Sequence, residues 1–184
     1  MALLEHSEPS ADVHNYKGVC HARTARYDSE FEEISRALEL DEQHVWATLN
    51  RGTIAQREQN RAEAIEWYGK ARLLDPENET ARGQLFYLLM RDKQYDEAMR
   101  EVAAFPSKAA RHFFAGEYHF LRLEYRHARR EYRRSLRVAP YFAEVHRKLA
   151  EIARRQKRPR AAIRHLVRVL ELLPHHSGAL RSLA

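Results

Sequence analysis

The chain has 184 residues, 44% hydrophobic and 32% charged, with only six Gly and six Pro, a composition that excludes a disordered chain and favours an all-α fold. Its one cysteine, Cys20, excludes an internal disulfide framework, and no apolar run reaches the ~20 residues of a membrane-spanning helix, so we expect no membrane insertion. The net charge of +6 is unevenly distributed: residues 1–106 carry 13 basic and 20 acidic side chains, whereas residues 107–184 carry 19 basic and 6 acidic side chains. Such an asymmetry is informative about binding partners rather than about the fold.

The first ten residues lack the basic-then-apolar order of a secretory signal, so a cytoplasmic setting is the default expectation. Residues 3–10 read like the end of a helix from a preceding repeat, and residues 177–184 read like the start of a following one. We therefore hypothesise that the chain is a fragment of a longer array. The alternative is a short natural protein with frayed ends.

Small or apolar residues recur through the chain with a period of 34 residues, with one interval of 30. One such series is Gly18, Gly52, Phe86, Gly116, Ala150 and Ala184. Proline recurs with the same spacings at Pro76, Pro106, Pro140 and Pro174. Alanine does so at Ala64, Ala98, Ala128 and Ala162. A fixed period of this length indicates stacked supersecondary units. The predicted helix pairs are 11–44, 45–78, 79–108, 109–142 and 143–176, followed by a partial capping helix at 177–184.

Local signals place several helix ends. Ser29 with Glu32 and Asn60 with Glu63 have the spacing of capping boxes. The third unit is four residues short, about one helical turn, so its second helix is predicted to be truncated near Phe105 and Pro106. Pro159 suits the first turn of a helix.

This pattern resembles the tetratricopeptide repeat (TPR) family over nearly the whole chain: a Gly or Ala in the first helix, an Ala then a bulky residue in the second, and Pro at the closing turn. The Trp position of the family is filled by His14, Thr48, Arg82, His112 and His146 instead. The resemblance implies a right-handed α-solenoid of helix-turn-helix repeats in which the first helices line a concave groove.

Four arginines of the implied groove, Arg23, Arg57, Arg91 and Arg155, share one register that Leu121 interrupts, and aromatic residues are interleaved with them. The predicted peptide- or protein-binding residues are Arg23, Trp46, Asn50, Arg57, Tyr87, Arg91, Phe113, Phe120, Arg147, Arg154 and Arg155. Arginine and aromatic side chains are common anchors of protein interfaces, and guanidinium groups suit carboxylates. Solvated helix ends are the alternative interpretation. Capture of chaperone-tail carboxylates, known in some TPR proteins, is rejected because only Asn50 matches its residue set.

A second charged feature is expected on the convex side. Its six residues recur after 34 positions: Arg126, Arg130, Arg134, Arg160, Arg164 and Arg168. A spacing of four keeps each trio on one helix face. A solvated face, an acidic partner, and nucleic acid or an anionic surface are the open interpretations, although no nucleic-acid-binding motif is present.

Catalytic and metal sites are not expected. Phosphate-binding loops, nucleophile elbows and HExxH are absent. The pairs His14/His21 and His112/His119 are interpreted as half-buried, hydrogen-bonded packing residues, and Cys20 as a small buried side chain. No cofactor and no metal are predicted.

The sequence thus predicts a non-enzymatic scaffold that binds an acidic and apolar protein or peptide segment in a concave groove. Nucleic-acid or anionic-surface binding through the basic C-terminal half is one alternative. A substrate-presenting array of a larger enzyme is another. Self-association through the array ends is a further expectation.

Overall fold

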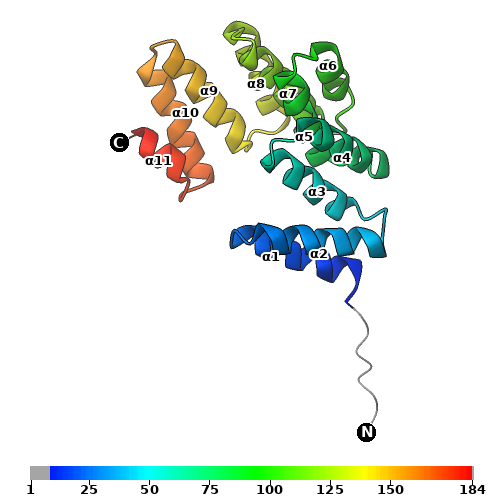
Figure 1. Ribbon diagram of the computed structural model, residues 1–184. Coiled ribbons are helices and arrows are strands. Elements are labelled where there is room, and N and C mark those ends of the chain that lie inside the picture. The colour runs from blue at the N-terminus through cyan, green and yellow to red at the C-terminus, as the bar shows by residue number, and fades with distance from the viewer. Residues whose placement is uncertain (1–8, 184) are drawn as a thin grey trace. The chain divides into compact units, whose positions relative to one another are not determined.

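The computed structural model describes residues 9–183, and the side chains of residues 9–182. Within this range the chain forms eleven α-helices and no strand (Figure 1). The predicted all-α fold is therefore confirmed. Most of the segment 3–10, predicted to end a preceding helix, lies outside the described residues, as does Ala184.

The helices follow one another with short turns. Their bounds are α1 Ala11–Arg23, α2 Tyr27–Leu40, α3 Val45–Arg57, α4 Arg61–Leu74, α5 Glu79–Arg91, α6 Tyr95–Ala103, α7 Lys108–Leu121, α8 Tyr125–Val138, α9 Ala143–Arg155, α10 Pro159–Leu172 and α11 Ser177–Leu183. No helix in the described range is long and apolar enough to cross a membrane.

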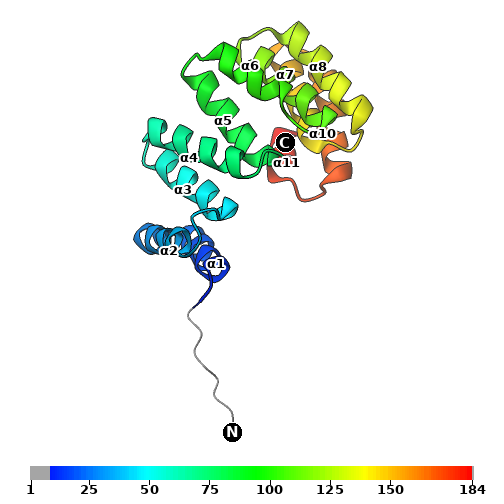
Figure 2. The same cartoon turned by 90° about the vertical axis from the view of Figure 1, so that its right-hand side faces the viewer.

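The helices divide between two compact units, and the boundary falls inside α5. Unit 1 runs to Leu88 and unit 2 begins at Leu89. In unit 1, α1 packs on α2 and α3 on α4; in unit 2, α7 packs on α8 and α9 on α10. The two helices of each such pair lie side by side in both views (Figure 2). Each pair is thus a helical hairpin, and α2 on α3 and α8 on α9 join successive hairpins.

Five helix–helix turns share one backbone form. Each contains a non-glycine residue with φ between 55° and 63°: Ala25, Gln59, Lys93, Leu123 and Lys157. The following residue donates its N–H to the carbonyl five positions earlier, at 2.8–3.0 Å in all five turns. The backbone hydrogen bond that ends one helix therefore also fixes the start of the next.

Close helix approach in three hairpins depends on a glycine in the first helix. A Cβ atom added at Gly18, Gly52 or Gly116 would lie 2.5–2.9 Å from the side chain sixteen residues later. Those side chains are Ile34, Tyr68 and Tyr132, all fully buried. The small residue that recurs in the first helix therefore packs against the bulky residue that recurs in the second.

Three of the four predictions about helix ends are confirmed and one is wrong. Asn60 caps α4 by accepting from the Glu63 N–H, and Pro159 is the first residue of α10, both as predicted. The truncation is also present, because α6 has 9 residues whereas α4 and α8 have 14. The capping box at Ser29 is wrong, since α2 begins two residues earlier at Tyr27.

The predictions for Cys20 and for the packing histidines had different outcomes. Cys20 is exposed, so its predicted burial is wrong; the buried residues of α1 are His14, Asn15 and Gly18, and Cys20 lies off that stripe. The hydrogen-bonded packing histidines are confirmed at His14, His112 and His119, each of which lies within hydrogen-bond distance of a glutamate, but not at His21, whose buried Nδ1 has no hydrogen-bond partner among the described residues. His14 Nδ1 lies 2.6 Å from Glu33 Oε2, and His112 Nδ1 lies 3.0 Å from Glu131 Oε2.

In the α9–α10 hairpin two histidines face each other, His146 Nδ1 lying 3.2 Å from His165 Nδ1. Burial, followed by the positive charges of His146, Arg164 and Arg133, lowers the pKa of His165 to about 4. Burial is also the main cause that lowers the pKa of His146, with Arg168 adding to it and the Pro140 backbone and Glu171 opposing it. The folded chain therefore holds this pair neutral at pH values where an unfolded chain protonates both.

Stability should consequently fall as the pH drops from about 6.5 towards 4, because the unfolded state then binds more protons than the folded state. The check is urea denaturation at pH 7.5 and 5.0. We expect His165→Phe to lose less stability over this interval than the wild type. His175→Phe, a change at an exposed histidine, is the control and should lose as much as the wild type. Equal losses in all three chains would contradict the assignment.

Candidate functional site

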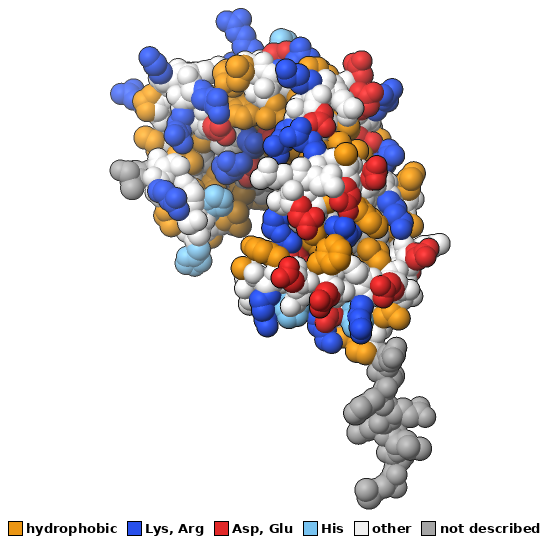
Figure 3. Space-filling model, in the orientation of Figure 1, with side chains coloured by type: hydrophobic (Ala, Val, Ile, Leu, Met, Phe, Trp, Pro, Cys, Tyr) orange, Lys and Arg blue, Asp and Glu red, His pale blue; other side chains and the backbone are white. Residues whose placement is uncertain are grey.

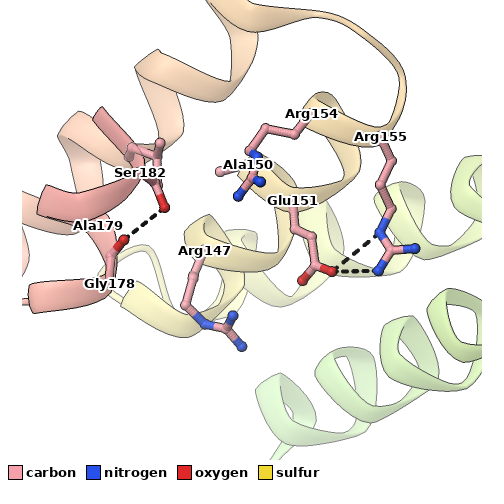
Figure 4. Close-up of a pocket in the computed structure, with 9 residues that line it drawn as sticks. Arg147, Ala150, Glu151, Arg154, Arg155, Gly178, Ala179 and Ser182 are labelled. Carbon is pink, nitrogen blue, oxygen red and sulfur yellow. Dashed lines mark hydrogen bonds and ion pairs between the residues drawn. The ribbon is translucent and has the colours of Figure 1, made fainter. Parts of the chain in front are cut away.

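A pocket of about 650 Å³ lies between α9 and α11 in unit 2 (Figure 4). Three arginines and one carboxylate of α9 form its polar side, and small residues of α11 form the opposite side. The lining residues are Arg147, Ala150, Glu151, Arg154, Arg155, Leu166, Gly178, Ala179 and Ser182. This volume is within the range of small-ligand and side-chain sites.

The helical period of α9 explains why these arginines converge. Positions 147, 151, 154 and 155 follow the i, i+4, i+7, i+8 spacing of one helix face. Val145, Leu149 and Ile152 are buried on the other side of the helix. The side chains of α11 that face the pocket are small, so they leave space in front of the guanidinium groups (Figure 4).

Two of the pocket arginines are held by partners. Arg155 donates to Glu151 Oε1 at 2.8 Å and to the Tyr125 hydroxyl at 3.2 Å. Both hydrogen bonds raise the pKa of Arg155, and the one to Glu151 has the larger effect. Arg147 donates through Nε to Glu144 at 2.8 Å, and this carboxylate raises the pKa of Arg147.

The third pocket arginine, Arg154, is exposed and makes no side-chain hydrogen bond or ion pair with any residue that the structure describes. Its guanidinium group extends into the space between α9 and α11 (Figure 4). The lining thus presents three positive charges against the single carboxylate of Glu151, and Arg154 is the one able to take a new anionic partner without breaking an ion pair.

The structure therefore brings together three of the predicted groove residues, Arg147, Arg154 and Arg155. It places two others, Phe113 and Phe120, in the hydrophobic core of unit 2. Lys148 and Arg155 lie over the Phe120 ring, at 5.1 and 5.2 Å from its centroid. These two rings hold the repeats together and are not surface anchors.

The predicted groove residues on α1, α3 and α5 have different surroundings. Arg23 and Trp46 are exposed, Trp46 by 57%. Asn50 donates to Asn15 Oδ1 at 2.7 Å and so joins two successive hairpins. Of the α5 residues, Tyr87 is half-buried with its ring edge-on to Phe86, and Arg91 at the helix end is exposed.

The arginine register has a structural explanation that the sequence did not reveal. Arg57 contacts Glu30 at 2.6 Å and lies 4.0 Å above the Tyr27 ring. Arg155 lies 6.0 Å from the Tyr125 ring, again thirty residues later in sequence. An arginine ending one hairpin's first helix therefore covers a tyrosine that begins the second helix of the preceding hairpin. The sequence signal was the Tyr–Arg spacing.

The six residues of the predicted basic patch lie on α8 and α10 of unit 2. Arg130 and Arg134 both contact Glu131, and Arg168 contacts Glu171 at 2.6 Å. Arg126, Arg160 and Arg164 are exposed and have no ion pair among the described residues. On the face shown in Figure 3, basic side chains are numerous over the C-terminal helices, and acidic ones over α1 and α2.

Stacked helical hairpins, with the same turn between the two helices of each, define a helical repeat protein of the TPR type. Solved TPR structures match this fold, so the chain has the TPR fold. One is TTC0263, a thermophilic TPR protein in Thermus thermophilus, with a TM-score of 0.75 at 18% identity, covering 94% of this chain and 96% of that one.

Two further structures show the same likeness at 18% identity. PilW, a type IV pilus biogenesis factor, has a TM-score of 0.69, with 89% of this chain and 78% of that one covered. YrrB, a TPR protein with an unusual peptide-binding site, has a TM-score of 0.55, with 94% of this chain and 91% of that one covered. No protein-family model and no curated protein sequence matches the chain.

Proposed function

We propose that the chain is a non-enzymatic interaction scaffold, and that the pocket between α9 and α11 binds an acidic segment of a protein partner. The observation that carries the proposal is Arg154, which is exposed on the pocket wall without an ion pair among the described residues. The TPR fold supports it, because proteins with this fold are generally interaction scaffolds.

The chemistry of the lining favours a carboxylate beside an apolar side chain. Arginine presents a planar fork that can donate two hydrogen bonds to one carboxylate. Leu166, Ala150 and Ala179 supply apolar surface next to it. A peptide with alternating Glu and Leu residues therefore satisfies both halves of the pocket.

The test is fluorescence anisotropy with a labelled peptide of alternating Glu and Leu residues. Arg154→Glu should weaken binding by about tenfold or more, because a charge-assisted hydrogen bond becomes a repulsion. Arg181→Glu is the control: it makes the same charge change on exposed α11 surface outside the lining and should have little effect. Equal affinity of wild type and Arg154→Glu would contradict the proposal.

The exposed arginines of the basic patch favour one second candidate, nucleic-acid or anionic-surface binding. Arg126, Arg160 and Arg164 carry charge that no ion pair among the described residues neutralises. If this function is the correct one, Arg160→Glu with Arg164→Glu will abolish binding to a single-stranded RNA probe, and the logarithm of the affinity will fall steeply with the logarithm of salt concentration. Arg154→Glu will then have the smaller effect.

The remaining sequence predictions stay predictions. They are the repeat boundaries, the binding roles of Arg23, Trp46, Asn50, Tyr87 and Arg91, the cytoplasmic setting and self-association through the array ends. The alternative of a substrate-presenting array in a larger enzyme is tested by reading the full-length gene.

A further inference from the structure

His119, Glu124 and His127 meet at the turn between α7 and α8. One ligand atom of each residue lies within 4.8 Å of the other two. His119 Nδ1 is 2.7 Å from Glu124 Oε2, and the two imidazole rings are 5.2 Å apart between centroids. His119 and Glu124 are half-buried and His127 is exposed.

The turn itself brings the three side chains together. The Glu124 N–H donates to the His119 carbonyl at 2.8 Å. Glu124 is the N-cap of α8, so His127 occupies the third helical position. Side chains at these two positions face each other across the first turn of a helix, as in a capping box. The backbone thus fixes all three attachment points.

The fold does not require these residue types, because the other four turns have the same backbone hydrogen bond with different side chains. The corresponding positions hold His21, Arg26 and Ser29; Ala55, Asn60 and Glu63; Leu89, Gln94 and Glu97; and Ala153, Arg158 and Ala161. Only the α7–α8 turn combines two imidazoles with a carboxylate. The sequence pattern pairs His119 with His112, seven residues away, and does not indicate this cluster.

We propose that His119, Glu124 and His127 bind a Zn²⁺ ion. Two imidazole nitrogens and one carboxylate oxygen are ligands that Zn²⁺ accepts, whereas Mg²⁺ and Ca²⁺ prefer oxygen alone. Tetrahedral bonds of about 2.0–2.2 Å hold ligand atoms about 3.4 Å apart. Closing the set therefore requires His119 Nδ1 and Glu124 Oε2, which are 2.7 Å apart, to separate slightly, and the exposed His127 side chain to move towards them. The fourth position is left for water or a side chain of a partner.

Arg122 opposes the ion and limits its affinity. Its Nε lies 3.1 Å from Glu124 Oε1, and its Nη1 donates to the Tyr118 hydroxyl at 2.5 Å. The guanidinium group also lies over the Tyr95 ring, at 5.2 Å from the centroid. The Glu124 oxygen that faces His119 is the other one, Oε2. The carboxylate can therefore hold Arg122 with one oxygen and the metal with the other.

The experiment is titration of the full chain with Zn²⁺ against a chromophoric chelator. We expect one equivalent to bind, with an affinity reduced about tenfold or more in His127→Ala and unchanged in His175→Ala, which removes an exposed histidine outside the cluster. Arg122→Gln should bind Zn²⁺ more tightly, an effect that loss of folding would not produce. Mg²⁺ should not compete.

A second measurement separates the site from binding at other histidines. Zn²⁺ should raise the melting temperature of the wild type and of His175→Ala, but not that of His127→Ala. Failure of the wild type to bind, or equal binding by wild type and His127→Ala, would overturn the proposal. Neither result would bear on Arg154 and the acidic-segment pocket.

Discussion

Replacement of Lys148 by Met should lower the free energy of unfolding by about 3–5 kcal/mol. Lys148 Nζ on α9 lies 2.6 Å from Glu117 Oε2 on α7, and the Glu117 side chain is 0% exposed. The other Glu117 oxygen accepts from the Tyr132 hydroxyl. The ion pair joins successive hairpins of unit 2, and its removal takes away the positive charge that lies 2.6 Å from a buried carboxylate. Urea denaturation followed by far-UV circular dichroism measures the loss.

A double variant separates the ion pair from simple packing. In Lys148→Met with Glu117→Gln the buried charge is gone, so stability should be largely recovered relative to Lys148→Met alone. Lys157→Met removes an exposed lysine and should change the free energy of unfolding by less than about 0.5 kcal/mol. If Lys148→Met behaves like Lys157→Met, the ion pair contributes nothing to the stacking of these hairpins.

The repeat was predictable because its strongest signals are backbone requirements. Gly52 and Gly116 are needed where a Cβ atom would overlap a tyrosine, and Gly18, 34 residues before Gly52, is needed in the same way opposite Ile34. Pro159 is tolerated only in the first turn of a helix, which is where α10 begins. Such constraints act on single residue types, and a sequence displays them directly.

The site was less predictable because side-chain pairing depends on neighbours distant in sequence. The sequence predicted both Arg57 and Arg154 as groove residues. Arg57 proves to be bound to Glu30 and stacked on Tyr27, whereas Arg154 has no such partner among the described residues. Nor does the register show that α11 would complete a pocket in front of Arg154. Spacing alone places a side chain on a face but does not say what it contacts.

Replacement of Gly116 by Ala should destabilise the chain by about 1–3 kcal/mol, although alanine is the better helix former. The added Cβ would lie 2.5 Å from Cδ1 and Cε1 of Tyr132. Tyr132 cannot move aside easily, because its ring is 0% exposed and its hydroxyl is bonded to Glu117. The two helices would therefore have to separate, weakening the packing of α7 on α8.

The matched control is Gly69→Ala on α4, where an added Cβ meets no atom within 4 Å. Here only helix propensity acts, and we expect the chain to gain about 0.5–1 kcal/mol. Denaturation of the two variants should therefore shift in opposite directions, and hydrogen exchange should localise the loss in Gly116→Ala to α7 and α8. Stabilisation by both substitutions would mean that the hairpin accommodates the methyl group, and that the recurring glycine is not what allows these helices to approach.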